Sequence, residues 1–295
     1  MKKILIDVSE HQGVIDWEKV KPQIDGAILR CGYGSDYTDQ DDEQFKRNAD
    51  ECTRLGIPFG VYLYSYAKSI AQAQSEADHV LRLIKGYKLS YPVYLDLEEG
   101  GTQNGAVERA IVFGDIIEKA GYWCGIYANL YWWEVILKKG LERFTKWVAQ
   151  YNVMCEYDGA HLDIWQYSSK GKVDGINGNT DMNECYRDFP AEILGKTSTP
   201  VETPVVKPAA PAAKEEKSKV DYADSFNKDK AGTYKFNTPS GLNLRSGASM
   251  NKEVLETMPN GSKVKCYGYY TGEWLYVVSA SGKTGFCHGD YLEKV

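Results

Sequence analysis

The chain has 295 residues, of which 43% are hydrophobic and 26% are charged, and it carries a net charge of −6. This composition is ordinary for a globular protein, and the length suits one large domain with a smaller one. The acidic balance argues against a nucleic-acid binder, which needs clustered Lys and Arg. The sequence contains no run of about 18 apolar residues, so no membrane-spanning segment is predicted.

Lys2 and Lys3 resemble the positively charged start of a secretory signal peptide, but the rest of the N-terminal segment does not. The apolar run that follows them covers residues 4–6 and ends at Asp7. A signal peptide needs an apolar stretch of roughly 7–15 residues. We therefore expect a protein that is made in the cytoplasm and released by another agent.

Short β-type runs alternate with helical patterns through the first 190 residues. Apolar residues recur at three- and four-residue spacing over residues 45–55, 73–84 and 107–117, which predicts three helices. Gly56, Gly86 and Gly121 follow them, where glycine commonly ends a helix. The predicted strands are Ile4–Ser9, Ala27–Tyr33, Pro58–Tyr66, Pro92–Glu98, Tyr122–Ala128, Lys146–Tyr151, Leu162–Tyr167 and Asp181–Tyr186.

About eight strands that alternate with helices predict an α/β fold with a parallel sheet closed into a barrel. The gaps over residues 152–161 and 168–180 barely hold a helix with its two loops, and a parallel crossover needs a dozen or more residues. We therefore expect an irregular, shortened (β/α) barrel that lacks its late helices and in which some late strands run antiparallel.

Residues 196–230 are predicted to be a linker between two domains. The stretch 196–219 holds four prolines among small and charged residues and has no aromatic residue, so it cannot bury a core. The predicted domains are residues 1–195 and residues 231–295. In the second, turn signals such as Pro259-Asn260-Gly261 separate short strands, which predicts a small all-β barrel. Its predicted strands are Leu242–Arg245, Lys263–Tyr270, Trp274–Ser279 and Lys283–His288.

The cysteines and histidines give no sign of a metal. The seven cysteines are scattered without a CxxC pair, and the four histidines are isolated. Such a pattern argues against a disulfide framework and a zinc site. We predict neither a metal site nor a cofactor.

The strongest chemical signal is a pair of acids near the end of the fourth predicted strand. Asp96 and Glu98 are two residues apart, so their side chains would share one face of the strand. Like charges so close push the two pKa values apart, which leaves one group able to donate a proton while the other stays ionised. Cleavage of a glycosidic bond needs this division of labour, although a solvated or salt-bridged pair fits the motif alone equally well.

Two further acids are expected at the same place. Asp7 ends the first apolar run and Asp181 opens the last predicted strand. In a closed barrel the first and last strands are neighbours, so both acids would meet Asp96 and Glu98 at its mouth. Converging carboxylates are costly and therefore indicate a functional site.

Aromatic residues near predicted strand ends supply the second part of a sugar site. Sugar rings stack on aromatic faces, but an aromatic residue at strand spacing is more often part of the core. The candidate substrate-binding residues are Tyr33, Tyr62, Tyr64, Tyr127 and Trp165, with Gln166 next to the last of these.

The sequence resembles glycoside hydrolase family 25, the Chalaropsis-type lysozymes found in phage endolysins and bacterial autolysins. The matching stretches occur in family order across nearly all of residues 4–190. They are residues 7–17 (DVSEHQGVIDW), 27–34 (AILRCGYG), 60–64 (GVYLY), 94–98 (YLDLE), 125–127 (GIY), 165–167 (WQY) with 175–176, and 181–183 (DMN).

This resemblance implies roles for the four acids. Glu98 would donate a proton to the glycosidic oxygen, and Asp96 would stabilise positive charge at the anomeric carbon or position the N-acetyl group. Asp7 and Asp181 would complete the acidic cluster. The implied substrate is peptidoglycan, cut at the β-1,4 bond between N-acetylmuramic acid and N-acetylglucosamine. A covalent and a substrate-assisted first step both remain open.

Residues 242–292 resemble a bacterial SH3-like wall-binding domain. The motifs are residues 242–247 (LNLRSG), 274–277 (WLYV), 285–286 (GF) and 291–292 (YL). Domains of this kind bind wall peptides or polymers, although a small barrel with no ligand of its own is the alternative. Trp274 and Tyr269 are candidate contacts.

We expect a phage endolysin that lyses a Gram-positive host, and three alternatives remain open. A bacterial autolysin would use the same chemistry. An N-acetylglucosaminidase of the chitinase type would carry a DxxDxDxE run, and residues 92–94 are Pro, Val and Tyr instead. A non-catalytic wall-binding protein would most simply have lost one of the four acids.

Overall fold

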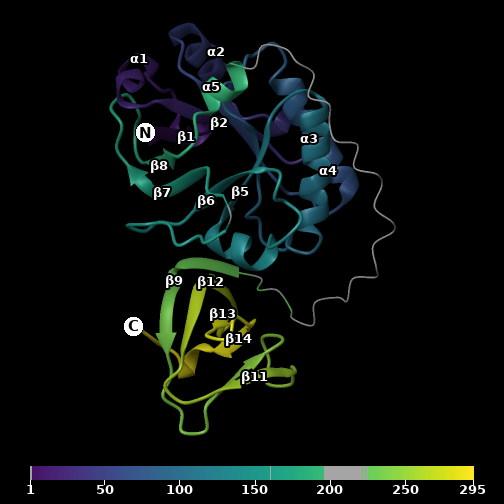
Figure 1. Cartoon of the computed structure of the whole chain (residues 1–295), viewed down its shortest axis with the longest axis vertical. Helices are drawn as coiled ribbons and strands as arrows, with labels where there is room; N and C mark the ends of the chain where they lie inside the picture. Colours follow the sequence, from purple (N-terminus) through teal and green to yellow (C-terminus); the bar gives the residue numbers. More distant parts are fainter. Residues whose placement is uncertain (1, 160, 196–220, 222, 224) are drawn as a thin grey trace. The chain divides into compact units, whose positions relative to one another are not determined.

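The computed structural model describes residues 2–159, 161–195 and 225–295, together with residues 221 and 223 (Figure 1). The chain forms two compact units, Met1–Ser198 and Thr199–Val295. The proline-rich stretch 196–219 lies outside the described residues. Among the residues that are described, no helix combines the length and the apolar character needed to cross a membrane.

The first unit is built on a closed barrel of eight strands in chain order. Seven of the strands run parallel, and β8 runs antiparallel to both of its neighbours, β7 and β1. The prediction of an irregular α/β barrel with an antiparallel late strand is confirmed. The strands are β1 Lys3–Val8, β2 Gly26–Tyr33, β3 Phe59–Tyr64, β4 Val93–Asp96, β5 Cys124–Asn129, β6 Thr145–Ala149, β7 Ile164–Gly171 and β8 Thr180–Cys185.

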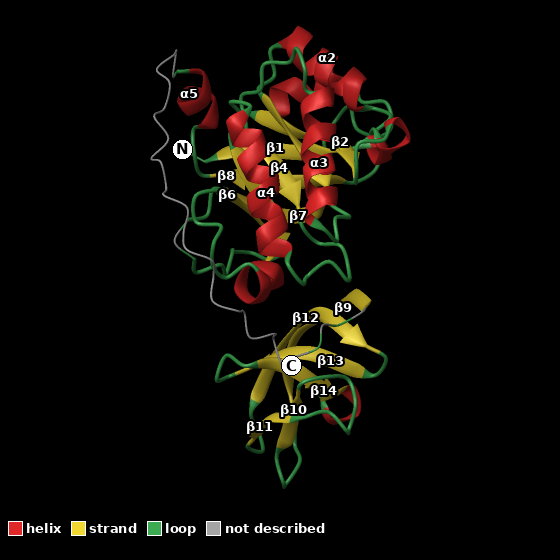
Figure 2. Ribbon diagram, turned by 90° about the vertical axis from the view of Figure 1, so that its right-hand side faces the viewer, coloured by secondary structure: helices red, strands yellow, loops and turns green. Residues whose placement is uncertain are grey.

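Three long helices follow the early strands and cover the outside of the barrel. They are α2 Phe45–Leu55, α3 Ile70–Leu83 and α4 Ala106–Lys119, as the apolar spacing predicts. The Ser69 side chain caps α3 by accepting a hydrogen bond from the Gln72 N–H, and Gly56 ends α2 in the left-handed conformation. Figure 2 shows α3 and α4 side by side across the strands. The short helices are α1 Trp17–Val20 and α5 Phe189–Leu194.

The late part of the barrel lacks long helices. Only a π-helical turn over Trp132–Ile136 separates β5 from β6, and no helix is present between β6 and β7, among residues 150–159 and 161–163, or between β7 and β8. Eight residues connect β7 to β8, too few for a parallel crossover, so the chain turns back and pairs antiparallel.

Large side chains fill the barrel interior below its mouth. Tyr94 and Tyr127 pack edge-on against Trp147, with ring centroids 5.2 Å and 4.6 Å away. Gly125 makes room for this packing, because a Cβ there would lie 2.3 Å from both the Tyr94 ring and the Thr145 hydroxyl. Tyr94, Tyr127 and Trp147 therefore form a tightly packed group, the aromatic plug, that fills the barrel beneath its mouth.

The second unit is a seven-stranded antiparallel sheet with its own apolar core, which confirms the predicted all-β fold. β9 begins at Ser225, inside the segment that the sequence assigns to the linker. Neither β9, whose sequence is largely polar, nor β11 is among the predicted strands. The strands are β9 Ser225–Lys235, β10 Leu242–Arg245, β11 Val254–Met258, β12 Lys263–Thr271, β13 Trp274–Ser279, β14 Thr284–His288 and β15 Glu293–Lys294.

Candidate active site

Asp96 and Glu98 lie where β4 leaves the barrel. β4 ends at Asp96, two residues earlier than the predicted strand, but the Leu97 N–H still donates to the Tyr127 carbonyl of β5 and extends the pairing by one residue. The alternation of side chains therefore continues as far as Glu98. The two carboxyl groups interact, because the charge of Glu98 raises the pKa of Asp96.

Asp7 and Asp181 come to the same edge from the other side of the barrel. They are direct register partners on β1 and β8. Because β8 runs antiparallel, its first residues lie at the carboxyl-terminal edge of the other strands. The charge of Asp181 raises the pKa of Asp7 and also that of Glu98. The structure thus brings all four predicted acids together.

Burial raises the pKa of each of these carboxyl groups. The pKa of Asp7 rises to about 8 through burial and then the charge of Asp181, and that of Glu98 rises to about 7 through burial and then the charges of Asp181 and Glu99. Burial raises the pKa of Asp181 to about 6. Burial, Glu98 and Asp7 raise the pKa of Asp96 well above its ordinary value. The cluster therefore retains protons near neutral pH, as a proton donor requires.

Asp96 carries an unsatisfied oxygen. The residue is 4% exposed, and its Oδ1 is buried with no hydrogen-bond partner among the described residues. A buried carboxylate oxygen without a donor costs stability unless the group is protonated or a ligand supplies the bond. This oxygen therefore lacks a hydrogen bond that a proton or a ligand would supply.

Gln166 joins three polar groups at the mouth. Its Oε1 accepts hydrogen bonds from the hydroxyls of Tyr127 at 3.0 Å and Tyr151 at 3.1 Å, and its Nε2 donates to Asp7 Oδ2 at 2.9 Å. The amide thus orients one acid and two tyrosines at the same time. Tyr151 is the last residue of the predicted strand 146–151 but is absent from the predicted site; β6 itself ends at Ala149.

Asn183 is a second amide that holds Asp7. Its Nδ2 donates to Asp7 Oδ2 at 2.8 Å, and its Oδ1 accepts from the Trp147 indole at 2.8 Å. Asn183 is not among the predicted site residues. Its position two residues after Asp181 places both on one face of β8, so alternation along the strand was the available signal.

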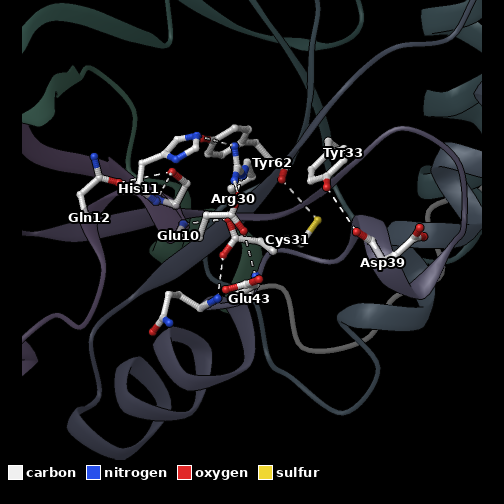
Figure 3. Close-up of polar contacts among 12 residues, drawn as sticks. Glu10, His11, Gln12, Arg30, Cys31, Tyr33, Asp39, Glu43 and Tyr62 are labelled. Atoms are coloured by element: carbon white, nitrogen blue, oxygen red, sulfur yellow. Dashed lines mark hydrogen bonds and ion pairs between the residues drawn. The ribbon is translucent and has the colours of Figure 1, made fainter.

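Arg30 is a cation whose charge acts on the acidic cluster, and Figure 3 shows it beside Glu10. It lies on β2 and forms ion pairs with Asp42 at 2.8 Å and Glu10 at 2.7 Å. Its charge lowers the pKa of Asp96, against the larger effect of burial. Arg30 is not among the predicted site residues, because only the folded barrel brings its charge to act on Asp96.

Three predicted tyrosines line this edge. Tyr64 donates its hydroxyl to Glu99 Oε2 at 2.9 Å, and its ring lies 5.1 Å from that of Tyr66. Tyr33 packs edge-on against Tyr66 at 6.2 Å and donates its hydroxyl to the Asp39 carbonyl, as Figure 3 shows. Burial and the charges of Asp7 and Asp96 raise the pKa of Tyr62. Aromatic and acidic groups therefore adjoin, as a sugar site requires.

Trp165 lies apart from this group. Its neighbour Gln166 points into the barrel toward Asp7, so alternation on β7 directs Trp165 outward. The Trp165 indole donates to the Gln150 carbonyl at 2.8 Å. The structure thus does not bring this residue together with the four acids.

One possible metal-ligand group occurs among the described residues, and it lies in the second unit. Ligand atoms of Glu273, His288 and Asp290 lie within 4.8 Å of one another. Both acids are exposed, and the His288 ring packs against Trp274 and Tyr291. Tyr269, one of the two predicted wall contacts, is only 4% exposed and belongs to the interior of this unit.

A closed α/β barrel with interacting carboxyl groups at the carboxyl ends of its strands defines a glycoside hydrolase of the barrel class. Comparison with protein families gives the particular one. The model of "Glycosyl hydrolases family 25" matches residues 6–176, and the chain belongs to this family. The model of "Bacterial SH3 domain" matches residues 240–293.

Relatives with known names or structures include bacterial and phage proteins. The autolysin LytC of Streptococcus pneumoniae is 33% identical, with a TM-score of 0.57 over 63% of this chain and 47% of that chain. The catalytic domain of endolysin ply40 from bacteriophage P40 of Listeria monocytogenes is 26% identical, with a TM-score of 0.58 over 66% and 98%. The "Autolytic lysozyme" of Clostridium acetobutylicum is 26% identical over 61% of this chain and 54% of that protein. The chain thus spans about half the length of two of these three relatives.

Proposed function

We propose that this protein is a peptidoglycan hydrolase, a lysozyme that cleaves the β-1,4 bond between N-acetylmuramic acid and N-acetylglucosamine. The observation that carries the proposal is the cluster of four interacting carboxyl groups at the barrel mouth of a family 25 chain. Similarity to an autolysin, an endolysin and an autolytic lysozyme supports peptidoglycan as the substrate.

In this proposal Glu98 is the proton donor. A pKa of about 7 leaves a large protonated fraction at neutral pH, and burial, together with the neighbouring charges of Asp181 and Glu99, maintains this pKa. Asp96 offers its unpaired Oδ1 to the substrate and stabilises positive charge at the anomeric carbon once it is ionised. Asp7 and Asp181 hold the pair, and Tyr33, Tyr62, Tyr64 and Tyr127 contact the sugar rings, with Gln166 orienting the mouth.

The parts of the chain would divide the work. Residues 1–195 would cut the glycan strand, residues 196–230 would connect, and residues 231–295 would bind a wall component. Exposed aromatic surface supports the last assignment, since Tyr291 is 52% exposed and its ring packs with His288. We place the enzyme with phage-type endolysins that lyse a Gram-positive host after release from the cytoplasm, and the similarity to ply40 supports this setting.

The decisive experiment is mass spectrometry of fragments released from purified Gram-positive peptidoglycan by wild type and by Glu98→Gln. New reducing ends on N-acetylmuramic acid, lost in the variant, are expected. Glu108→Gln, an exposed change on α4, is the matched control and should cut like wild type. Reducing N-acetylglucosamine would indicate the rival glycosidase, and no cleavage by wild type would contradict the proposal.

Wall binding is tested separately in the full-length Glu98→Gln chain, which is expected to hold walls without cutting them. Adding Tyr291→Ala should weaken retention on sedimented walls, because it removes the exposed ring. Adding Tyr37→Ala, an exposed tyrosine of the first unit, is the control. Equal retention by all three chains would show that this surface of the second unit is not the wall contact.

A further inference from the structure

A buried carboxylate on α3 lies outside the acidic cluster. Glu76 is 1% exposed and accepts three hydrogen bonds from the segment that follows β3. Its Oε2 accepts from the Ser65 hydroxyl at 2.7 Å, and its Oε1 accepts from the backbone N–H groups of Tyr66 at 2.8 Å and Ala67 at 2.9 Å. Burying a carboxylate is costly, and three donors offset this cost only if the turn keeps this geometry.

The turn held by Glu76 is in direct contact with the end of β4. The Ser65 N–H donates to the Asp96 carbonyl at 3.0 Å, two residues before Glu98. Tyr64, immediately before Ser65, donates its hydroxyl to Glu99 at 2.9 Å. The backbone of Asp96 and the side chain of Glu99 are thus tied on both sides of Glu98 to a segment whose position depends on Glu76.

A buried arginine on α4 acts on the next loop in a similar way. Arg109 is 5% exposed, and its guanidinium donates to the carbonyls of Asn104, at 2.7 Å, and Thr102. Both carbonyls belong to the loop that follows Glu99. Burial raises the pKa of Glu76 to about 7, and its three hydrogen bonds and then the charge of Arg109 act against this rise. Glu76 and Arg109, on adjacent helices, therefore hold the two loops that flank Glu98.

We infer that Glu76 is a positioning residue of the active site, which sets the place of the Glu98 carboxyl group by holding the Ser65–Ala67 turn against the end of β4. The inference rests on the proposed function. A misplacement of about 1 Å at a reacting group can reduce the rate about a hundredfold, so a turn that anchors this group controls turnover.

Two substitutions separate the hydrogen bonds from the charge. In Glu76→Gln the amide oxygen can accept from both backbone N–H groups, and the amide nitrogen can donate to the Ser65 hydroxyl, so the turn keeps its partners. In Glu76→Ala all three donors lose their hydrogen-bond acceptor. On soluble peptidoglycan we expect Glu76→Ala to lose at least about tenfold in kcat with a smaller change in KM, and Glu76→Gln to stay within about threefold of wild type.

Val80→Ala is the matched control for lost stability. Val80 is fully buried on the same helix, and its side chain has no group that could form a hydrogen bond with the turn. It should lower the melting temperature but leave kcat unchanged at a temperature where all variants are folded. Equal losses of kcat in Val80→Ala and Glu76→Ala would overturn the inference, as would a Gln variant no better than the Ala variant.

Backbone hydrogen exchange gives a readout that does not depend on activity. Glu76→Ala should accelerate exchange at Ser65, whose N–H donates to the Asp96 carbonyl, and at Leu97, whose N–H donates to Tyr127 of β5. Val80→Ala should accelerate neither. If wild type cuts no glycan but this pattern appears, the proposed function fails while the positioning contact stands. If exchange at Leu97 stays at the wild-type rate, the positioning role of Glu76 is refuted.

Discussion

Asp7 and Asp181 stand opposite each other as register partners on β1 and β8, although they are 174 positions apart in the chain. When both acids are ionised, they repel each other in this relationship on antiparallel strands, and opposed like charges destabilise a sheet. Asp7 is held there by the amides of Gln166 and Asn183. The barrel therefore closes on a pair that weakens it, and the charge of Asp181 also acts on Glu98.

Replacing Asp181 by Asn should shift the pH dependence of activity. The negative charge of Asp181 raises the pKa of Glu98, so its removal lowers that pKa. A proton donor with a lower pKa loses its proton earlier as the pH rises, and the alkaline limb of the kcat/KM profile moves to lower pH. Asp78→Asn, an exposed change on α3, should leave the limb in place. An unmoved limb in the Asp181 variant would show that another group titrates there.

Replacing Asp7 by Asn should stabilise the protein at alkaline pH. The pKa of Asp7 is about 8 in the folded protein against 3.8 for the free group, so the folded state binds the proton more tightly. Stability from this group is complete below pH 4 and is lost as the pH rises toward 8, at no more than about 1.4 kcal/mol per pH unit. Asn cannot lose a proton, and its oxygen still accepts from Gln166 and Asn183.

The measurement for Asp7→Asn is urea unfolding at pH 5 and pH 8, followed by tryptophan fluorescence. Six of the seven tryptophans belong to residues 1–195, so the signal reports mainly on the barrel. The variant should gain stability over wild type between the two pH values, whereas Asp174→Asn, an exposed change, should not. A constant difference would rule out Asp7 as the titrating group.

Asn183→Leu should destabilise the barrel by about 2–4 kcal/mol, because two buried groups lose a partner at roughly 1–3 kcal/mol each. The Trp147 indole would lose its acceptor and Asp7 would keep a single amide donor. A double-mutant cycle with Trp147→Phe checks the mechanism. In the Phe background the cost of Asn183→Leu should fall by about 1 kcal/mol or more. Additive costs would mean that the Trp147 contact contributes nothing.

Gly125→Ala should cost about 1–3 kcal/mol through overpacking. The new methyl group would lie 2.3 Å from the Tyr94 ring and the Thr145 hydroxyl, both of which are buried. Gly100→Ala is the control variant, since an added Cβ at Gly100 meets nothing within 4 Å. Thermal unfolding should separate the two alanine variants clearly. Equal melting temperatures would show that the aromatic plug is looser than its geometry indicates.

Local patterns predicted the elements well and the site in part. Alternation placed Asp96 and Glu98 on one face, and helical spacing located α2, α3 and α4 close to their observed bounds. The same patterns cannot separate Trp165, which points outward, from Gln166, which points inward, because both positions are buried. Nor do they distinguish Glu76, a buried carboxylate, from the exposed acids that helices usually carry.

The sequence by itself determined the class of fold, the two-part organisation of the chain and the identity of the four acids. These depend on periodicity, composition and motifs, which are local properties. Only the tertiary structure decided that β8 is the late strand that runs antiparallel, that Gln166 and Asn183 both hold Asp7, and that Glu76 secures the turn beside Glu98. The amide contacts join residues 159 and 176 positions apart, and burial is what shifts the pKa values of the acids. Both effects arise only when the barrel closes and removes these groups from water.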